Sequence, residues 1–86
     1  MTSTLFILND APYGNERAYN ALRLAGALAG KAEQQVRLFL LADAVACAKG
    51  GQKVPEGYYN LQLMLGKVLR QGEVVLCGTC MDARGL

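Results

Sequence analysis

The chain has 86 residues, of which 52% are hydrophobic and 19% charged, and its formal net charge is +2. This length predicts a single small domain, residues 1–86, and the apolar content excludes a disordered chain. The basic residues form no run, so nucleic acid is not an expected partner. No apolar stretch approaches the ~18 residues of a membrane span, so no membrane association is expected. A small domain with this much apolar surface has few charged residues to cover its outside, so a self-association surface is expected.

Cysteine and histidine usage narrows the possible chemistry. The chain holds three cysteines and no histidine. Its N-terminus lacks the basic region and apolar core of a secretion signal, so a reducing cytoplasmic location is expected rather than a disulfide scaffold. A zinc site needs about four ligands, which three cysteines without a histidine do not supply, so no metal is expected within one chain. No other cofactor is expected either. A Cys–His catalytic pair is excluded outright.

The first half of the chain predicts a strand followed by a helix. Residues 4–8 form a continuous apolar run, which is typical of a strand buried in a parallel sheet. The following loop contains Pro12 and Gly14, and its Asp10 is interpreted first as a turn or capping residue and second as a supporting residue of a site. Residues 15–31 then place apolar side chains at helical spacing, which predicts an amphipathic helix.

The second half repeats this alternation. Residues 36–41 predict a second strand, after which Asp43 is a predicted N-cap for a short helical run over residues 44–48. Cys47 in that run is interpreted as a small core residue. The glycine-rich residues 49–57 lack the spacing of a phosphate-binding P-loop and predict a mobile flap, with residues 50–53 placed to cover a site. Residues 58–71 predict a second amphipathic helix, ended by Gly72.

The last segment carries the residues with chemical potential. Residues 74–76 predict a short strand buried on both faces, and Cys77 stands where that strand ends. Cys80 follows three residues later, and Asp82 and Arg84 come next, on the first turn of a predicted helix. The start of a helix favours negative charge, so a cysteine there is a candidate for a stabilised thiolate.

The alternation of strands and helices predicts an α/β fold with a parallel sheet and right-handed crossovers. The carboxyl ends of all strands then share one rim, which receives the loop after residue 9, the Asp43 turn and Cys77. If the strands are ordered 2-1-3, the loop with Asp10 lies beside Cys77. The chain ends at Leu86, where a helix is just beginning, so either a further helix and strand or another subunit is expected at this rim.

Four interpretations of Cys77-Gly78-Thr79-Cys80 remain open from the residues alone. A redox dithiol fits the spacing, although the proline and aromatic neighbours of thioredoxin-type motifs are missing. A metal site requires ligands from several subunits. The two thiols are alternatively small structural residues. Finally, Cys77 is a candidate nucleophile that carries sulfur as a persulfide, which requires an exposed thiol of low pKa on a rigid element.

Three segments of the chain, residues 9–25, 49–60 and 76–86, resemble the DsrE/DsrF-like family of sulfur-relay proteins, which includes TusD. The last segment is the most specific, because in the family members DsrE and TusD a cysteine that precedes an Arg-Gly pair accepts persulfide sulfur. By its spacing to Arg84-Gly85, Cys77 is the matching residue, while Cys80 has no counterpart in TusD. The resemblance implies a flavodoxin-like three-layer α/β fold, of which this chain is expected to lack the C-terminal helix and strand. It also implies trimers or hexamers.

The resemblance leads to a functional hypothesis. Cys77 takes sulfane sulfur from a donor protein and passes it to an acceptor protein, with Cys80 as an auxiliary or resolving thiol and Asp10, Thr79 and Arg84 in support. One alternative is a non-catalytic oligomeric subunit or a small-ligand-binding module with the same fold. A second alternative is a Cys-x-x-Cys dithiol oxidoreductase.

Overall fold

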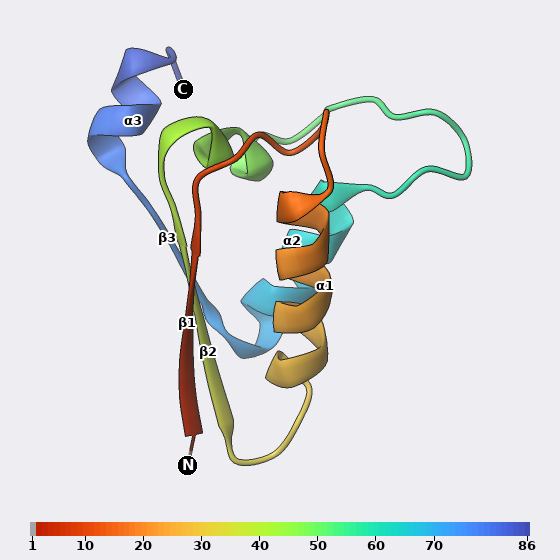
Figure 1. The fold of residues 1–86 in the computed structure, drawn as a ribbon, viewed down its shortest axis with the longest axis vertical. Coiled ribbons are helices and arrows are strands. Elements are labelled where there is room, and N and C mark those ends of the chain that lie inside the picture. The colour runs from red at the N-terminus through yellow and green to blue at the C-terminus, as the bar shows by residue number, and fades with distance from the viewer. Residues whose placement is uncertain (1) are drawn as a thin grey trace.

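Strands and helices alternate along residues 2–86, the part of the chain that this computed structural model describes (Figure 1). The elements are β1 (Thr2–Leu8), α1 (Arg17–Ala29), β2 (Gln34–Leu40), the 3-10 helix η1 (Ala42–Ala48), α2 (Leu61–Gln71), β3 (Glu73–Leu76) and α3 (Gly78–Ala83). Every strand and helix expected from the sequence is present, with ends that differ by a few residues. The α/β fold with a parallel sheet is therefore confirmed.

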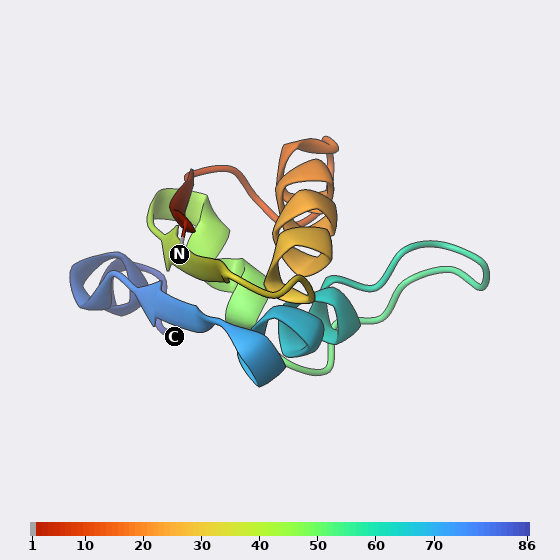
Figure 2. The ribbon, with the colours of Figure 1, turned by 90° about the horizontal axis from the view of Figure 1, so that it is seen from below.

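The sheet has the strand order β1-β2-β3, and both strand pairs are parallel. The connections from β1 to β2 and from β2 to β3 both move in the same direction across the sheet. Because such connections are right-handed, they place α1 and α2 on the same face. Figures 1 and 2 show both helices on that face. The order 2-1-3 is not found, and the described strands contain no point at which the order reverses. Consequently β2, and not β1, lies beside β3.

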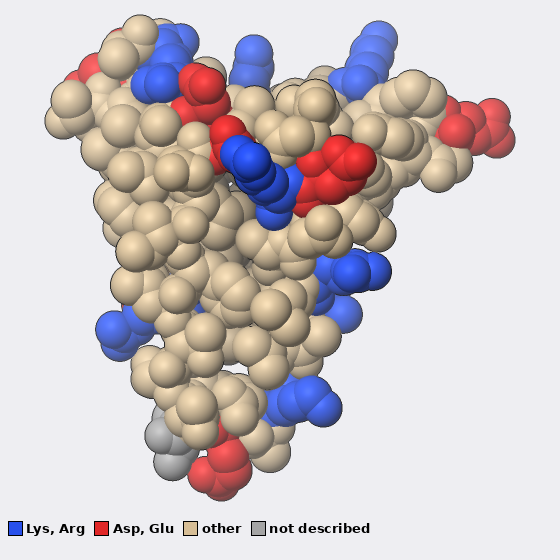
Figure 3. Space-filling view, viewed as in Figure 1, with Lys and Arg blue, Asp and Glu red and all other residues tan. Residues whose placement is uncertain are grey.

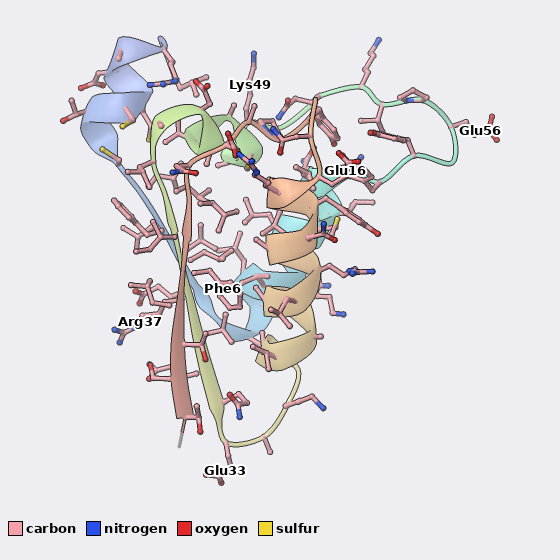
Figure 4. All side chains as sticks on the ribbon, viewed as in Figure 1. Phe6, Glu16, Glu33, Arg37, Lys49 and Glu56 are labelled. Atoms are coloured by element: carbon pink, nitrogen blue, oxygen red, sulfur yellow. The ribbon has the colours of Figure 1, made fainter. Side chains whose placement is uncertain are left out.

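The core fills the space between the sheet and its two long helices. Alternate strand residues point toward the helices, as Figure 4 shows for Phe6, while Arg37 points away from them. The buried apolar residues are Leu8, Ala18, Leu22, Ala25, Ala29, Val36, Leu38, Leu40, Ala44, Val45, Cys47, Leu61, Leu65 and Val68. Cys47 belongs to this set, so its interpretation as a core residue is confirmed.

The opposite face of the sheet is open. Leu5, Ile7 and Val75 are 58%, 63% and 46% exposed. Ile7 and Val75 flank Phe39 in one row across the three strands. The expectation that β1 and β3 are buried on both faces is thus wrong for these side chains, because neither long helix reaches this side. Residues 2–86 supply two layers of the three that the family resemblance implies.

Two local expectations are corrected at helix starts. Asp43 lies inside the first turn of η1, and the N-cap position is Leu41. The helix predicted from residue 58 begins only at Leu61, because the side chain of Asn60 accepts hydrogen bonds from the backbone N–H groups of residues 62 and 63. Asparagine is a preferred N-cap residue, so it marks the start of α2 and leaves the two preceding tyrosines in the loop.

All four tyrosines of the chain gather where the loops before α1 and α2 meet. The ring of Tyr59 lies 4.2 Å from that of Tyr19, 4.3 Å from that of Tyr58 and 5.6 Å from that of Tyr13, measured between centroids. The hydroxyl of Tyr13 accepts a hydrogen bond of 3.0 Å from the backbone N–H of Leu61. The tyrosine cluster therefore fastens the loop after β1 to the start of α2.

On the face in Figure 3, basic side chains are scattered and several lie beside acidic ones. An ion pair of 2.8 Å joins Arg17 Nη1 and Asp10 Oδ2. Within residues 2–86, none of the helices has the length and apolar character required to cross a bilayer.

Candidate functional site

Cys77 lies at the junction of β3 and α3. Its backbone N–H donates to the carbonyl of Leu40 at 2.9 Å, which continues the pairing of β3 with β2 by one step. Its own carbonyl accepts from the N–H of Met81 at 3.1 Å, which closes the first turn of α3. Cys77 is the N-cap of that helix and has an extended backbone. The thiol is partly exposed. The backbone on both sides of it is fixed by these hydrogen bonds.

The surroundings of Cys77 favour its thiolate. The pKa of Cys77 is lowered from the ordinary value of a thiol, first by the backbone N–H of Cys80 and then by the Cys80 thiol. The backbone N–H of Thr79 and the charge of Arg84 lower the pKa further, whereas partial burial opposes the change. Because the thiolate is the nucleophilic form of cysteine, Cys77 is the activated thiol of this chain.

Cys47 provides the contrast. It is free, like the other two cysteines, but it is 1% exposed, and burial raises its pKa to about 11. At neutral pH it is a protonated thiol that reagents do not reach. Cys77 and Cys80 are the accessible pair.

Arg84 connects α3 to η1. Its Nε and Nη2 donate to Oδ1 of Asp43 at 3.1 and 3.0 Å, and its Nη1 donates to the carbonyl of Cys80 at 3.1 Å. These contacts hold the guanidinium over the short helix that carries both thiols. Asp43 was not among the site residues expected from the sequence. Its turn after β2 was, however, expected at the same rim of the sheet as Cys77.

The other expected residues are placed differently. Thr79 is exposed on α3, and its backbone N–H acts on Cys77. Asp10 follows β1, which β2 separates from β3, and its carboxylate pairs with Arg17. The structure therefore brings Thr79, Cys80 and Arg84 to Cys77 but does not bring Asp10 there.

The loop between η1 and α2 does not cover the thiols. Its base is fixed by Gln52, whose Nε2 donates to the carbonyls of Ala46 and Lys49 at 2.8 and 2.9 Å. From there the loop extends to the side of the molecule opposite α3 in both Figure 1 and Figure 2. The expected cover of the site by residues 50–53 is not found.

A small apolar pocket adjoins α3. Its volume is about 230 Å³, and it is lined by Val45, Ala48, Lys49, Leu76, Met81 and Leu86. Its lining includes residues of both η1 and α3, and Lys49 is the one basic residue among them. Across residues 2–86, no group of three or more His, Cys, Asp and Glu side chains is arranged to hold a metal ion.

Comparison with known proteins places this site in a family. The family model described as DsrE/DsrF-like matches residues 2–86. The chain belongs to the DsrE/DsrF-like family. This finding confirms the resemblance drawn from the segments before and around Cys77.

Several relatives of this DsrE/DsrF-like chain share more than two fifths of its sequence. Protein YchN of Escherichia coli is 46% identical over 88 aligned residues, which span 100% of this chain and 74% of YchN. An uncharacterised protein of Methanopyrus kandleri is 43% identical over 81 residues, covering 93% of this chain and 65% of the relative. The crystal structure of YchN superimposes with a TM-score of 0.90 over 99% of this chain and 74% of its own. The described fold is therefore the family fold.

Proposed function

We propose that this DsrE/DsrF-like protein carries sulfane sulfur as a persulfide on Cys77, between a donor and an acceptor protein. The observation that carries the proposal is the state of that thiol. It is partly exposed, its pKa is lowered by the backbone N–H and the thiol of Cys80, and it stands on a strand end anchored to β2. Membership of the family supports the proposal, because the matching cysteine of its sulfur-relay members accepts persulfide sulfur.

The loading step needs only a thiolate and a persulfide. Cys77 attacks the outer sulfur of a donor persulfide, a new S–S bond forms at Cys77 Sγ, and the donor thiolate leaves with the electron pair of the bond that breaks. The acceptor thiolate repeats this attack on the outer sulfur of Cys77. No metal, redox cofactor or histidine takes part. The relay depends on a reactive thiolate that a partner protein can reach, which Cys77 provides and Cys47 does not.

Mass spectrometry of the intact protein tests the loading step. The reduced protein is incubated with a low-molecular-weight persulfide, alkylated and weighed, beside Cys77→Ser, Cys80→Ser and Cys47→Ala. We expect the mass of added sulfur on Cys80→Ser, none on Cys77→Ser, and the same result for Cys47→Ala as for the parent protein. The Cys47→Ala protein is the matched control, because it removes a thiol that the reagent does not reach.

Sulfur loading that survives in Cys77→Ser would contradict the assignment. A complete lack of sulfur on the folded, reduced Cys80→Ser protein would contradict the carrier function and leave the binding module as the better explanation. Retained folding is verified for each variant by far-UV circular dichroism.

A dithiol oxidoreductase is the second candidate, favoured by the place of Cys80 one helical turn after Cys77, where its thiol lowers the pKa of Cys77. It predicts that Cys77→Ser and Cys80→Ser abolish reduction of a disulfide substrate equally. The carrier predicts that sulfur loading depends on Cys77 alone. Comparing both variants in both assays separates the two functions.

We also propose that the chain works as a homo-oligomer, a trimer or hexamer as the family resemblance implies, and that it meets its donor and acceptor proteins at the rim that bears Cys77. The exposed side chains of Leu5, Ile7 and Val75 are apolar surface of the kind that subunit contacts bury. Light scattering after size-exclusion chromatography tests this, and a monomer across the micromolar range would contradict it.

A further inference from the structure

We propose that Cys80 discharges sulfur from Cys77: its thiol attacks Cys77 Sγ in the persulfide, closes a Cys77–Cys80 disulfide and releases sulfide. The inference rests on the proposed loading of Cys77 and adds a second reaction at the same site. It makes the protein a persulfide reductase whenever no acceptor protein takes the sulfur first.

The position of Cys80 selects the atom that is attacked. Cys80 lies one helical turn after Cys77, and its thiol and backbone N–H both lower the pKa of the Cys77 sulfur. This atom becomes the inner sulfur when Cys77 is loaded, whereas the added sulfur extends beyond it. Cys80 therefore faces the inner sulfur, and attack there expels the outer sulfur as sulfide.

The helix provides the spacing for a disulfide. Cys77 is the N-cap of α3 and Cys80 is its third residue. Residues three apart in an α-helix have Cα atoms about 5 Å apart, inside the range of roughly 4.4–6.8 Å that disulfides span. The first turn of α3 is closed by the Met81 N–H, and Arg84 holds the carbonyl of Cys80. The bond is thus compatible with the helix as it stands.

Packing gives the two thiols different roles. Cys80 packs against the hydrophobic core beside Met81, whereas Cys77 is not among the residues packed against that core. A partner persulfide therefore meets Cys77 first, and Cys80 acts from the inner side. Cys47 cannot replace it, because Cys47 is buried in the core and its pKa is raised to about 11.

The reaction balances without a further reactant. The bond between Cys77 Sγ and the outer sulfur breaks, and the bond between the Sγ atoms of Cys77 and Cys80 forms. The outer sulfur is reduced to sulfide and takes up the proton of the Cys80 thiol, while the two cysteine sulfurs are oxidised to the disulfide. A dithiol reductant then restores both thiols for another turnover.

A single-turnover experiment tests the inference. The reduced parent protein is mixed with a limiting amount of glutathione persulfide, and sulfide is trapped while samples are alkylated for intact mass. We expect one sulfide per loaded chain and a final mass lower by two hydrogen atoms, with no alkylation of Cys77 or Cys80. The Cys80→Ser protein keeps the added sulfur, and its sulfide release is at least about 100-fold slower, because the attack is no longer intramolecular.

Controls separate this inference from the proposed function. Cys47→Ala should behave as the parent does, and Cys80→Ala repeats the test where serine disturbs the packing. A parent protein that keeps its added sulfur as long as Cys80→Ser would overturn the discharge step and leave the carrier intact. Sulfide release with a disulfide between two chains would overturn it as well. If neither parent nor Cys80→Ser takes up sulfur, it is the loading step that fails.

Discussion

Gly72 joins α2 to β3, and replacing it with alanine should destabilise the fold. A Cβ at this position would lie 2.7 Å from the carbonyl oxygen of Val36 and 3.1 Å from that of Val68. Both neighbours are backbone atoms, in β2 and α2, so neither can rotate away. The backbone of Gly72 itself is extended, at φ −136° and ψ −163°, which any residue adopts. The obstacle to alanine is therefore contact and not torsion.

The expected cost follows from that overlap. Forcing an extra carbon into a packed site costs about 1–3 kcal/mol, and the smaller unfolded-state entropy of alanine offsets about 0.4–1 kcal/mol of it. Gly66 is the matched control, because it lies inside α2 and a Cβ there meets nothing within 4 Å. Alanine at Gly66 should stabilise the protein by about 1 kcal/mol. The same substitution thus has opposite signs six residues apart.

Urea denaturation of the parent, Gly72→Ala and Gly66→Ala measures these free energies of unfolding. In thermal melts, each kcal/mol corresponds to about 4–8 °C in a domain of this size. The reasoning would be refuted if Gly72→Ala were as stable as Gly66→Ala.

Further substitutions test the site and the helix starts. Arg84→Gln removes a cation that favours the Cys77 thiolate, so the pKa of that thiol should rise and its alkylation by iodoacetamide should need a higher pH. An unchanged pH profile would contradict a role for this charge. Asn60→Ala should lower the free energy of unfolding by about 1 kcal/mol in urea, through the loss of the N-cap of α2; a cost near zero would mean that water replaces it. Tyr13→Phe should lower the free energy of unfolding by about 1 kcal/mol in urea, since the N–H of Leu61 loses its acceptor while the ring is kept. Stability equal to that of the parent would contradict a role for this hydrogen bond.

The strands and helices were predictable from local patterns, because each of them depends mainly on residues that are neighbours in the sequence. Apolar runs marked the strands and helical spacing marked α1 and α2. The order of the strands depends instead on which distant segments pair, and periodicity carries no information about that. The apolar side chains of Leu5 and Ile7 looked buried for this reason: a run of this kind predicts cover on both faces, while the observed order places both long helices on one.

The site was predictable to the extent that it lies in one short segment. Cys77, Cys80 and Arg84 are close in sequence, and one helical turn brings them together. The partner of Arg84 is Asp43, which is 41 residues away and reaches it through the pairing of β2 with β3. Asp10 follows β1, the edge strand farthest from β3. Its carboxylate accepts a hydrogen bond from Arg17, seven residues later in the sequence, and takes no part in the site.

The tyrosine cluster makes one corner of the molecule optically distinct. The chain has no tryptophan, and all four tyrosines belong to this cluster. Both ribbon views show α3 on the opposite side from the loop that contributes Tyr58 and Tyr59 (Figures 1 and 2). Tyrosine fluorescence is therefore a built-in probe on the side away from the thiols, because thiols and disulfides do not emit. A change in that emission during oxidation of the thiols would report a rearrangement transmitted across the sheet, and constant emission would report a reaction confined to α3.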